Sequence, residues 1–200
     1  MAMIKQIGVM VISAALMTPV LAQAEGAYIG FNAGRANQKV NVSGDDGDGS
    51  VKDNATGYKL YGGYEFNQYF GVQGGYIDLG KGKIAYADSD VQGNFSSKVR
   101  SLYIAATATL PINEQFALFA KLGVSRNRVK IVDVYTDAGV AGYISESETR
   151  TTPLIGIGAA YNFSKKLAAV LEYENFGKVA KDDGVNLKAN LFSVGLRYKF

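Results

Sequence analysis

The chain has 200 residues, including 13 Tyr and 24 Gly, and contains no His, Cys or Trp. These absences exclude Ser-His-Asp and Cys-His catalysis, Cys/His zinc sites, haem ligation by His or Cys, and disulfide bonds. The formal net charge of +3, from 21 Lys and Arg against 18 Asp and Glu, is too small to indicate a nucleic-acid partner.

The first 24 residues have the pattern of an export signal. One cation, Lys5, precedes an apolar stretch over residues 7–21, and the small-x-small sequence AQA closes it at residues 22–24. A membrane-anchoring helix is the alternative. However, such a helix needs about 20 apolar residues, and Pro19 interrupts this run. We therefore expect a signal peptide over residues 1–24, cleavage after Ala24, and a mature domain over residues 25–200.

Eight segments of the mature region alternate with a period of two, which predicts β-strands. The first covers about residues 27–40 and the last ends at Phe200. One face of each segment is apolar and uncharged, whereas the other carries the strand charges and many glycines. Short turns are expected near residues 67–69, 111–115 and 164–166. Long polar loops are expected near residues 41–55, 79–97, 132–149 and 178–187.

The connections and the aromatic residues distinguish between two all-β folds. A soluble sandwich would also alternate, but short turns at one end and long loops at the other are typical of outer-membrane barrels. Aromatic residues gather near the short turns, where an interfacial girdle belongs. An even strand number closes the sheet without an edge in lipid. We therefore predict an all-β fold, an eight-stranded antiparallel up-and-down transmembrane β-barrel. The aromatic residues are Tyr64, Phe66, Tyr69, Phe70, Phe116, Tyr161, Phe163, Tyr198 and Phe200.

Several stretches resemble a known family when their order and spacing are taken together. They are YGGY at residues 61–64, GVQGGYIDLG at 71–80, FAKLG at 119–123, PLIGIGAAY at 153–161, LEY at 171–173 and SVGLRYKF at 193–200. The mature region resembles the transmembrane domain of outer-membrane protein A and its small OmpA-like relatives. The resemblance implies residence in the outer membrane of a Gram-negative bacterium, reached through the periplasm, with outer-membrane lipid as partner.

The sequence departs from the full-length members of that family in two respects. Their periplasmic peptidoglycan-binding domain has no counterpart after Phe200, so we do not expect a wall-anchoring function. Paired lumen charges of the family fall at positions that read Gln73, Thr107, Ala160 and Val170 here. The charged gate is therefore expected to be largely missing.

The terminal segment also resembles the signal that the outer-membrane assembly machinery reads, because alternating large apolar residues end in an aromatic one. The alternative is an ordinary last strand with an aromatic end. The residues of this predicted assembly signal are Phe192, Val194, Leu196, Tyr198 and Phe200.

Charged residues on the inward face predict a polar network in the lumen. An eight-stranded lumen is narrow enough for long side chains to meet across it. Lys121 and Glu172 stand at similar distances from their short turns, so we expect them to meet and form a polar plug that restricts conductance. Glu174, Lys59 and Arg197 could join this network or compete for the same partners.

Cations near the long-loop ends of the strands are candidates for contact with the phosphates of lipopolysaccharide. Ordinary loop solubility is the alternative explanation. The candidates are Lys81, Lys83, Lys98, Arg100, Arg126, Arg128 and Lys130.

No motif indicates catalysis or a cofactor. The acidic loop at residues 43–50 lacks the Gly and the closing Glu of a calcium loop. Glu172 and Glu174 are spaced like paired carboxylates, but a filled barrel offers no substrate cleft. We expect a structural, membrane-integrity role with at most narrow, porin-like passage of small solutes. An adhesin or host-evasion protein that binds a host-surface ligand through its outer loops is the alternative.

Overall fold

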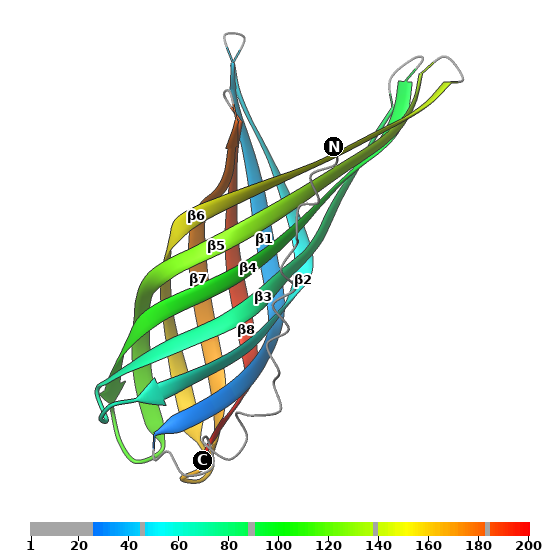
Figure 1. Ribbon diagram of the computed structural model, residues 1–200. Coiled ribbons are helices and arrows are strands. Elements are labelled where there is room, and N and C mark those ends of the chain that lie inside the picture. The colour runs from blue at the N-terminus through cyan, green and yellow to red at the C-terminus, as the bar shows by residue number, and fades with distance from the viewer. Residues whose placement is uncertain (1–25, 45–46, 88–90, 138–139, 183–184) are drawn as a thin grey trace, which may run out of the picture.

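The computed structural model describes residues 26–44, 47–87, 91–137, 140–182 and 185–200, which form a closed eight-stranded barrel in sequence order (Figure 1). Each strand pairs antiparallel with its neighbours along the chain, and β1 pairs with β8 to close the sheet. The predicted fold class is confirmed. The strands are β1 (Ala27–Gly44), β2 (Gly47–Glu65), β3 (Phe70–Ala87), β4 (Val91–Pro111), β5 (Phe116–Asp137), β6 (Val140–Asn162), β7 (Leu167–Asp182) and β8 (Val185–Lys199).

Some sequence predictions fall outside the described residues. These are the signal peptide over residues 1–24, Asp45 and Asp46 of the acidic loop, and the side chains of Asp48 and Lys83. Within the described part of the chain, no helix is long and apolar enough to cross a membrane.

The three short turns share one hydrogen-bonding arrangement that fixes where the strands reverse. The side-chain Oδ1 of Asn67 accepts hydrogen bonds from the backbone N–H groups of Tyr69 and Phe70, both at 2.9 Å. Asn113 and Ser164 play the same part in the second and third turns. Asn and Ser side chains satisfy turn backbones in this way, so local sequence sets this end of the barrel.

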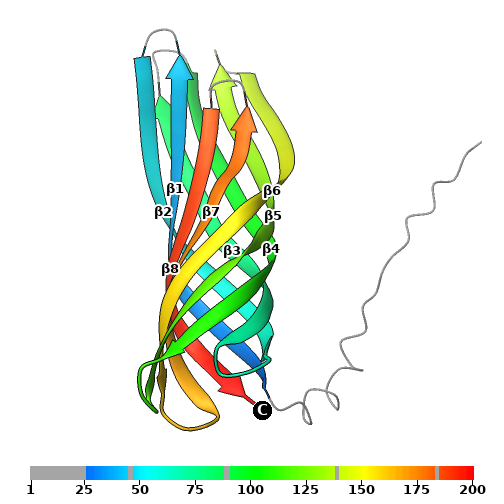
Figure 2. The ribbon, with the colours of Figure 1, turned by 90° about the vertical axis from the view of Figure 1, so that its left-hand side faces the viewer.

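At the opposite end, the segments predicted as long polar loops are mostly strand, and that prediction is wrong. The β1–β2 ladder continues to the pair Gly44↔Gly47, and the β5–β6 ladder to Asp137↔Val140. These extended hairpins rise beyond the barrel wall (Figure 2). Polar residues are compatible with such hairpins, because a sheet that faces water tolerates polar side chains. Polar composition therefore does not mark where these strands end.

Two glycine-containing bulges shift the strand register where the outer hairpins begin, and β7 has a further shift between Lys178 and Ala180. One bulge lies between Asp78 and Lys81 in β3, and the other between Asn175 and Lys178 in β7. Each contains a glycine with positive φ, 77° at Gly80 and 64° at Gly177. The preceding Asp78 and Asn175 side chains accept the glycine N–H at 2.9 and 2.8 Å. Glycine adopts this conformation without the strain that other residues would incur.

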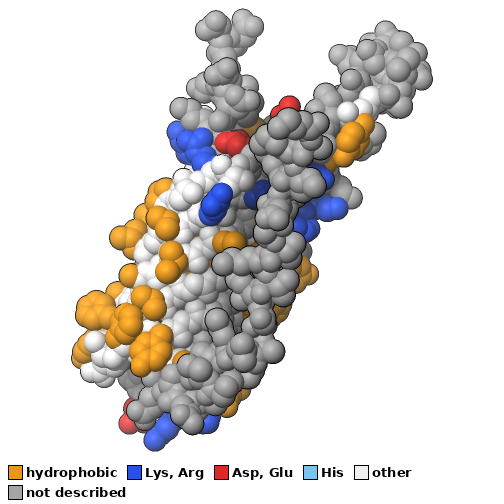
Figure 3. All heavy atoms as spheres, viewed as in Figure 1, with side chains coloured by type: hydrophobic (Ala, Val, Ile, Leu, Met, Phe, Trp, Pro, Cys, Tyr) orange, Lys and Arg blue, Asp and Glu red, His pale blue; other side chains and the backbone are white. Residues whose placement is uncertain are grey.

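The alternation of side chains separates a lipid-facing wall from a filled lumen. On the outer wall, Leu122 is 65 % exposed, whereas its neighbour Lys121 points inward and is 2 % exposed. Apolar side chains cover the lower part of the outer wall, and Lys and Arg side chains appear above them (Figure 3). The prediction that all strand charges face inward is therefore incomplete. Arg126 and Arg128 project outward, because the strands continue above the apolar band.

Candidate functional site

Four charged side chains meet in the middle of the lumen and form a closed ring of ion pairs. Lys59 of β2 contacts Glu172 and lies 3.0 Å from Glu174, both on β7. Lys121 of β5 contacts Glu172 from the other side and lies 3.1 Å from Glu174. All four side chains are fully buried. The ring, defined as Lys59, Lys121, Glu172 and Glu174, carries two positive and two negative charges, so buried charge is balanced.

Small and aromatic neighbours make room for this ring. A Cβ on Gly156 would lie 2.8 Å from Cγ of Lys121 and 3.3 Å from Cγ of Glu174, so glycine leaves the space that these two chains occupy. Lys59 Nζ also lies 4.7 Å from the centre of the Tyr61 ring, within the range of a cation–π contact. Gly156 therefore makes room for two members of the ring, while Gly30 and Gly158 lie against the rings of Tyr61 and Phe119.

Arg197 faces the lumen but does not join the ring. Its guanidinium lies over the rings of Tyr28 and Phe119, at 4.7 and 5.1 Å from their centres. Its nearest carboxylate is that of Glu65, at 3.9 Å, and Lys199 also pairs with Glu65 at 2.7 Å. Arg197 thus belongs to a separate charged group beside the short turns, which the sequence analysis missed. The sequence did contain a signal for this group, because Glu65 and Lys199 are the last inward-facing residues of β2 and β8 at the short-turn end.

The described lumen holds charge, although the positions of the family's charged gate carry none. The four substituted positions do face the lumen and are buried, namely Gln73, Thr107, Ala160 and Val170. The charges instead come from Lys59 and Glu174 in addition to Lys121 and Glu172. The sequence placed these residues on inward faces, but which of them meet depends on how β2, β5 and β7 lie across the closed barrel.

A second layer, which the sequence analysis missed, fills the lumen on the outer side of the ring. Ile77 is paired with Lys59 and Leu191 with Glu174, and further large apolar side chains follow toward the outer end. We define this layer as the outer apolar core. Its members are at most 1 % exposed: Ile77, Leu79, Val99, Val129, Leu154, Phe176, Val179 and Leu191. The bulge segments DLG and NFG contribute Leu79 and Phe176, which could have been recognised as apolar residues beside a glycine.

The residues of the predicted assembly signal all lie on the outer wall. Their exposed fractions range from 37 % for Phe200 to 58 % for Val194. The Tyr198 and Phe200 rings meet edge to face, with centres 5.4 Å apart. The N–H of Phe200 also donates to the carbonyl of Ala27 at 3.1 Å, so the last residue is bonded to the first strand.

The candidate phosphate-binding cations lie at the outer end of the barrel wall. Lys81, Lys98 and Arg100 come from β3 and β4, and Arg128 and Lys130 from β5; these five line one pocket of about 470 Å³. Arg126 is exposed on β5, opposite Leu102, and does not line the pocket.

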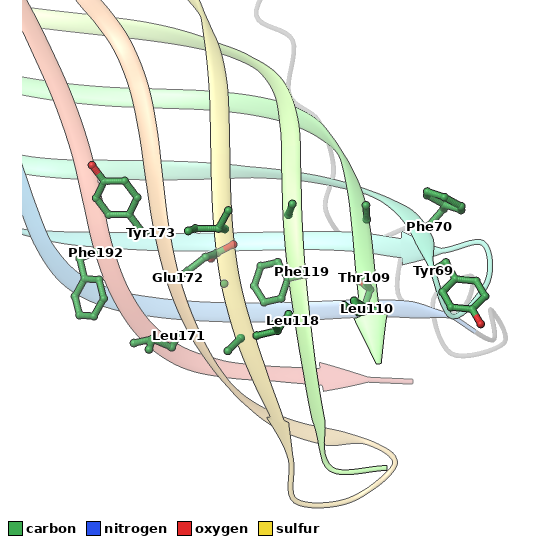
Figure 4. A pocket seen from close by; sticks show the side chains of 15 residues that line it. Tyr69, Phe70, Thr109, Leu110, Leu118, Phe119, Leu171, Glu172, Tyr173 and Phe192 are labelled. Atoms are coloured by element: carbon green, nitrogen blue, oxygen red, sulfur yellow. The ribbon is translucent and has the colours of Figure 1, made fainter. Parts of the chain in front are cut away.

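A separate groove of about 750 Å³ lies toward the short-turn end of the wall (Figure 4). Leu118, Leu171 and Tyr173 line it together with aromatic residues, and Ala108 and Ala120 leave space between them. Most of the lining side chains are apolar, which suits lipid acyl chains.

The outer wall is apolar, aromatic residues surround its short-turn end, and the closed sheet has no free strand edge. Together these features define an eight-stranded outer-membrane β-barrel. The model of the family described as OmpA-like transmembrane domain matches residues 22–200, and the chain belongs to this family. It is a protein of the bacterial outer membrane.

Curated relatives agree with this assignment. The chain is 27 % identical over 154 residues to outer membrane protein A of Klebsiella pneumoniae, covering 76 % of this chain and 43 % of the relative. It is 28 % identical over 155 residues to outer membrane protein A of Yersinia pseudotuberculosis, covering 76 % and 42 %. The chain thus spans less than half the length of these relatives.

Solved structures share the fold. The attachment invasion locus protein Ail of Yersinia pestis, in complex with the heparin analogue sucrose octasulfate, has a TM-score of 0.52 at 22 % identity, covering 86 % of this chain and 99 % of Ail. The Escherichia coli outer membrane protease OmpT has a TM-score of 0.50 at 11 % identity, covering 89 % of this chain and 98 % of OmpT. Barrels with different activities therefore share this architecture, and function has to be argued from the side chains.

Proposed function

We propose that this protein is a closed structural barrel that supports outer-membrane integrity and is neither an open pore nor an enzyme. The observation that carries the proposal is the filled lumen. The ring balances four buried charges, and the outer apolar core closes the space above it. In this proposal residues 1–24 are the signal peptide, residues 25–200 the barrel domain, and the assembly machinery inserts the domain through its terminal strand.

The ring and the outer apolar core block the lumen one after the other, and this arrangement predicts how the conductance responds to mutation. Wild-type protein in planar bilayers should show no sustained single-channel current. Glu172→Ala should change this little, because the outer apolar core still excludes water. Current should appear only when Glu172→Ala is combined with Leu154→Ala and Phe176→Ala, since both layers are then opened.

Heat-modifiable mobility on gels must show that each of these variants is folded before its current is compared. The matched control combines Glu172→Ala with Leu118→Ala and Leu171→Ala on the outer wall, and it should remain closed. A sustained current in the wild type, or in Glu172→Ala alone, would contradict the proposal of two layers.

Membrane integrity has its own test. A deletion strain should become more sensitive to detergents and large antibiotics, and expression of the wild-type chain should restore resistance. Restoration should not require the outer hairpins, because the barrel wall and the filled lumen lie below them. If the deletion strain is as resistant as its parent, a structural role is excluded.

Binding of a host-surface ligand is a second candidate, supported by the extended outer hairpins. Among them, β5 and β6 pair without interruption up to Asp137↔Val140, and in Figure 1 they lean away from the barrel axis. Ail, whose name describes attachment and invasion, shares the fold. Replacing residues 133–144 with a two-residue turn should abolish cell attachment in this case. An attachment level equal to that of the wild type would exclude this hairpin as the adhesive element.

A further inference from the structure

Cations stand directly opposite one another on the outer wall of β3, β4 and β5. Arg100 pairs with Arg128, and Lys98 is flanked by Lys130 on one side and Lys81 on the other. Like charges at directly opposite positions destabilise a sheet. An arrangement that repeats this repulsion across three strands therefore requires compensation from another source.

The described neighbours supply little of that compensation. Asp78 is paired with Arg100, and its Oδ2 lies 3.2 Å from Lys98 Nζ and 3.4 Å from Arg100 Nε. On the next strand, β6, neutral residues stand opposite Arg128 and Lys130, namely Thr149 and Ser147. In this described part of the wall, one carboxylate thus faces five cations. The cluster therefore has an excess of positive charge that an anion from outside the chain can neutralise.

The cations enclose a space for such an anion. Together with Ser96, Ser97 and Val132 they line the pocket of about 470 Å³. The side chain of Arg100 is 53 % exposed and that of Lys98 is 29 % exposed, so both can reach a ligand. Arginine and lysine bind phosphate through short, charge-assisted hydrogen bonds.

The bulge in β3 brings Lys81 into this cluster. Without the extra residue, the residue after Leu79 would continue the outward face and Lys81 would point into the lumen. The register shift between Asp78 and Lys81 instead places Lys81 opposite Lys98. Gly80 makes this possible, since its φ is 77° and a Cβ there would lie 2.6 Å from the carbonyl oxygen of Thr56.

The height of the cluster identifies the source of the anion. Immediately toward the short turns, Leu102 and Val124 are 62 % and 51 % exposed and belong to the apolar band that contacts lipid. The cluster begins two residues beyond Leu102 on β4, with Arg100, and four residues beyond Val124 on β5, with Arg128. This is the level at which the lipid head groups border the apolar layer. The described strands continue farther out, as far as the pair Asp137↔Val140, so a ligand held at this height is part of the membrane surface.

We propose that Lys81, Lys98, Arg100, Arg128 and Lys130 bind the phosphate groups of a phosphorylated glycolipid in the outer leaflet. The phosphates replace the missing carboxylates and relieve the repulsion between paired cations. The site is independent of the closed lumen. Its test and the conductance test can therefore fail separately.

The test uses the full-length chain refolded into phosphatidylcholine vesicles. Binding is measured with diphosphorylated lipid A, with the same glycolipid lacking its phosphates, with inorganic phosphate and with heparin. Wild-type protein should prefer diphosphorylated lipid A to all three alternatives. Arg100→Gln/Arg128→Gln should weaken that binding roughly 30-fold, which corresponds to about 1 kcal/mol for each charge near the membrane surface.

The matched control is Lys165→Gln/Lys166→Gln, which removes two exposed cations at a short turn and should leave lipid A binding unchanged. Lys98→Gln/Lys130→Gln provides a second variant of the cluster, and heat-modifiable mobility verifies folding. In vesicles without lipid A, the cluster variants should unfold at the same or a higher urea concentration than wild type, because a repulsion is removed.

Three results would overturn the proposal. One is equal binding of lipid A with and without phosphate. Another is an equal loss of binding in the short-turn control. The third is a preference of the cluster for inorganic phosphate or heparin, which would assign it to a ligand other than a membrane lipid.

Discussion

Lys59 and Lys121 each contact both glutamates, so every charge in the ring has two opposite neighbours. Because this balance is buried, the removal of one member leaves an unmatched charge that water cannot reach. The loss of a second member of opposite sign restores neutrality. The ring therefore acts as a unit, and its members cannot be assigned separate contributions to stability.

Lys59→Met should lower the free energy of unfolding by about 3–5 kcal/mol, because it leaves the two glutamates with a single cation. Lys59→Met combined with Glu174→Gln should cost less than the sum of the two single changes. Urea titrations of refolded protein in vesicles measure both. Lys199→Met, at a partly exposed pair with Glu65, is the control and should cost at most about 1 kcal/mol. Additive losses in the double variant would show that the ring does not act as a unit.

A charge on the outer wall should be costly according to its depth in the membrane. Leu122→Arg should destabilise the barrel by about 2–4 kcal/mol if it lies near the bilayer midplane. Val124→Arg, one outward position closer to Arg126, should cost less, because the penalty falls toward the interface. Denaturant titrations in the same vesicles compare the two. A larger cost at Val124 would mean that the apolar band is centred farther out.

At the scale of the strands, sequence periodicity predicted the strands and their two faces, whereas the short turns and the aromatic residues beside them distinguished a barrel from a sandwich, which would also alternate. Periodicity failed at the outer hairpins, where polar and apolar residues are mixed and neither composition nor alternation marks the turn. The ring was only partly predictable. Similar heights on β5 and β7 brought Lys121 and Glu172 together in prediction, but the participation of Lys59 depends on the cross-lumen position of β2. That position is a property of the closed sheet and is absent from any local pattern.

The last strand should govern insertion. Phe200→Ser should reduce the folded protein in the outer membrane and leave more unfolded protein in the periplasm, because it removes the aromatic end of β8. The measurement is the heat-modifiable fraction in isolated membranes. Phe163→Ser removes an aromatic residue that is more exposed, 59 % against 37 % for Phe200, from an internal short turn and should insert normally. Equal defects in both variants would indicate a general loss of aromatic contacts with the interface.

For the whole molecule, the apolar band sets the thickness of the membrane that suits the barrel. On β5 the exposed apolar positions run over residues 116–124. At about 3.3 Å per residue and a strand tilt of about 40°, they span about 23 Å. This is thinner than the roughly 30 Å core of a typical bilayer.

Refolding should consequently be more complete in vesicles of short-chain lipids than in those of long-chain lipids of the same head group. A mismatch of several ångströms costs a fraction of a kcal/mol per ångström. Gel mobility before and after heating gives the folded fraction in each lipid. Refolding that improves with longer chains would place the outer cations inside, rather than above, the lipid-facing band.

The pairing of β1 with β8 also means that the barrel has no structural beginning. Phe200 is hydrogen-bonded to Ala27, so a short linker between residues 200 and 27, with the chain opened at residues 113–114, would give a circular permutant that encodes the same sheet. Its final strand would be β4, which ends in Leu110 and Pro111 and lacks the aromatic end of β8. Permutation would therefore separate the shape of the barrel from the identity of the segment that leaves the ribosome last.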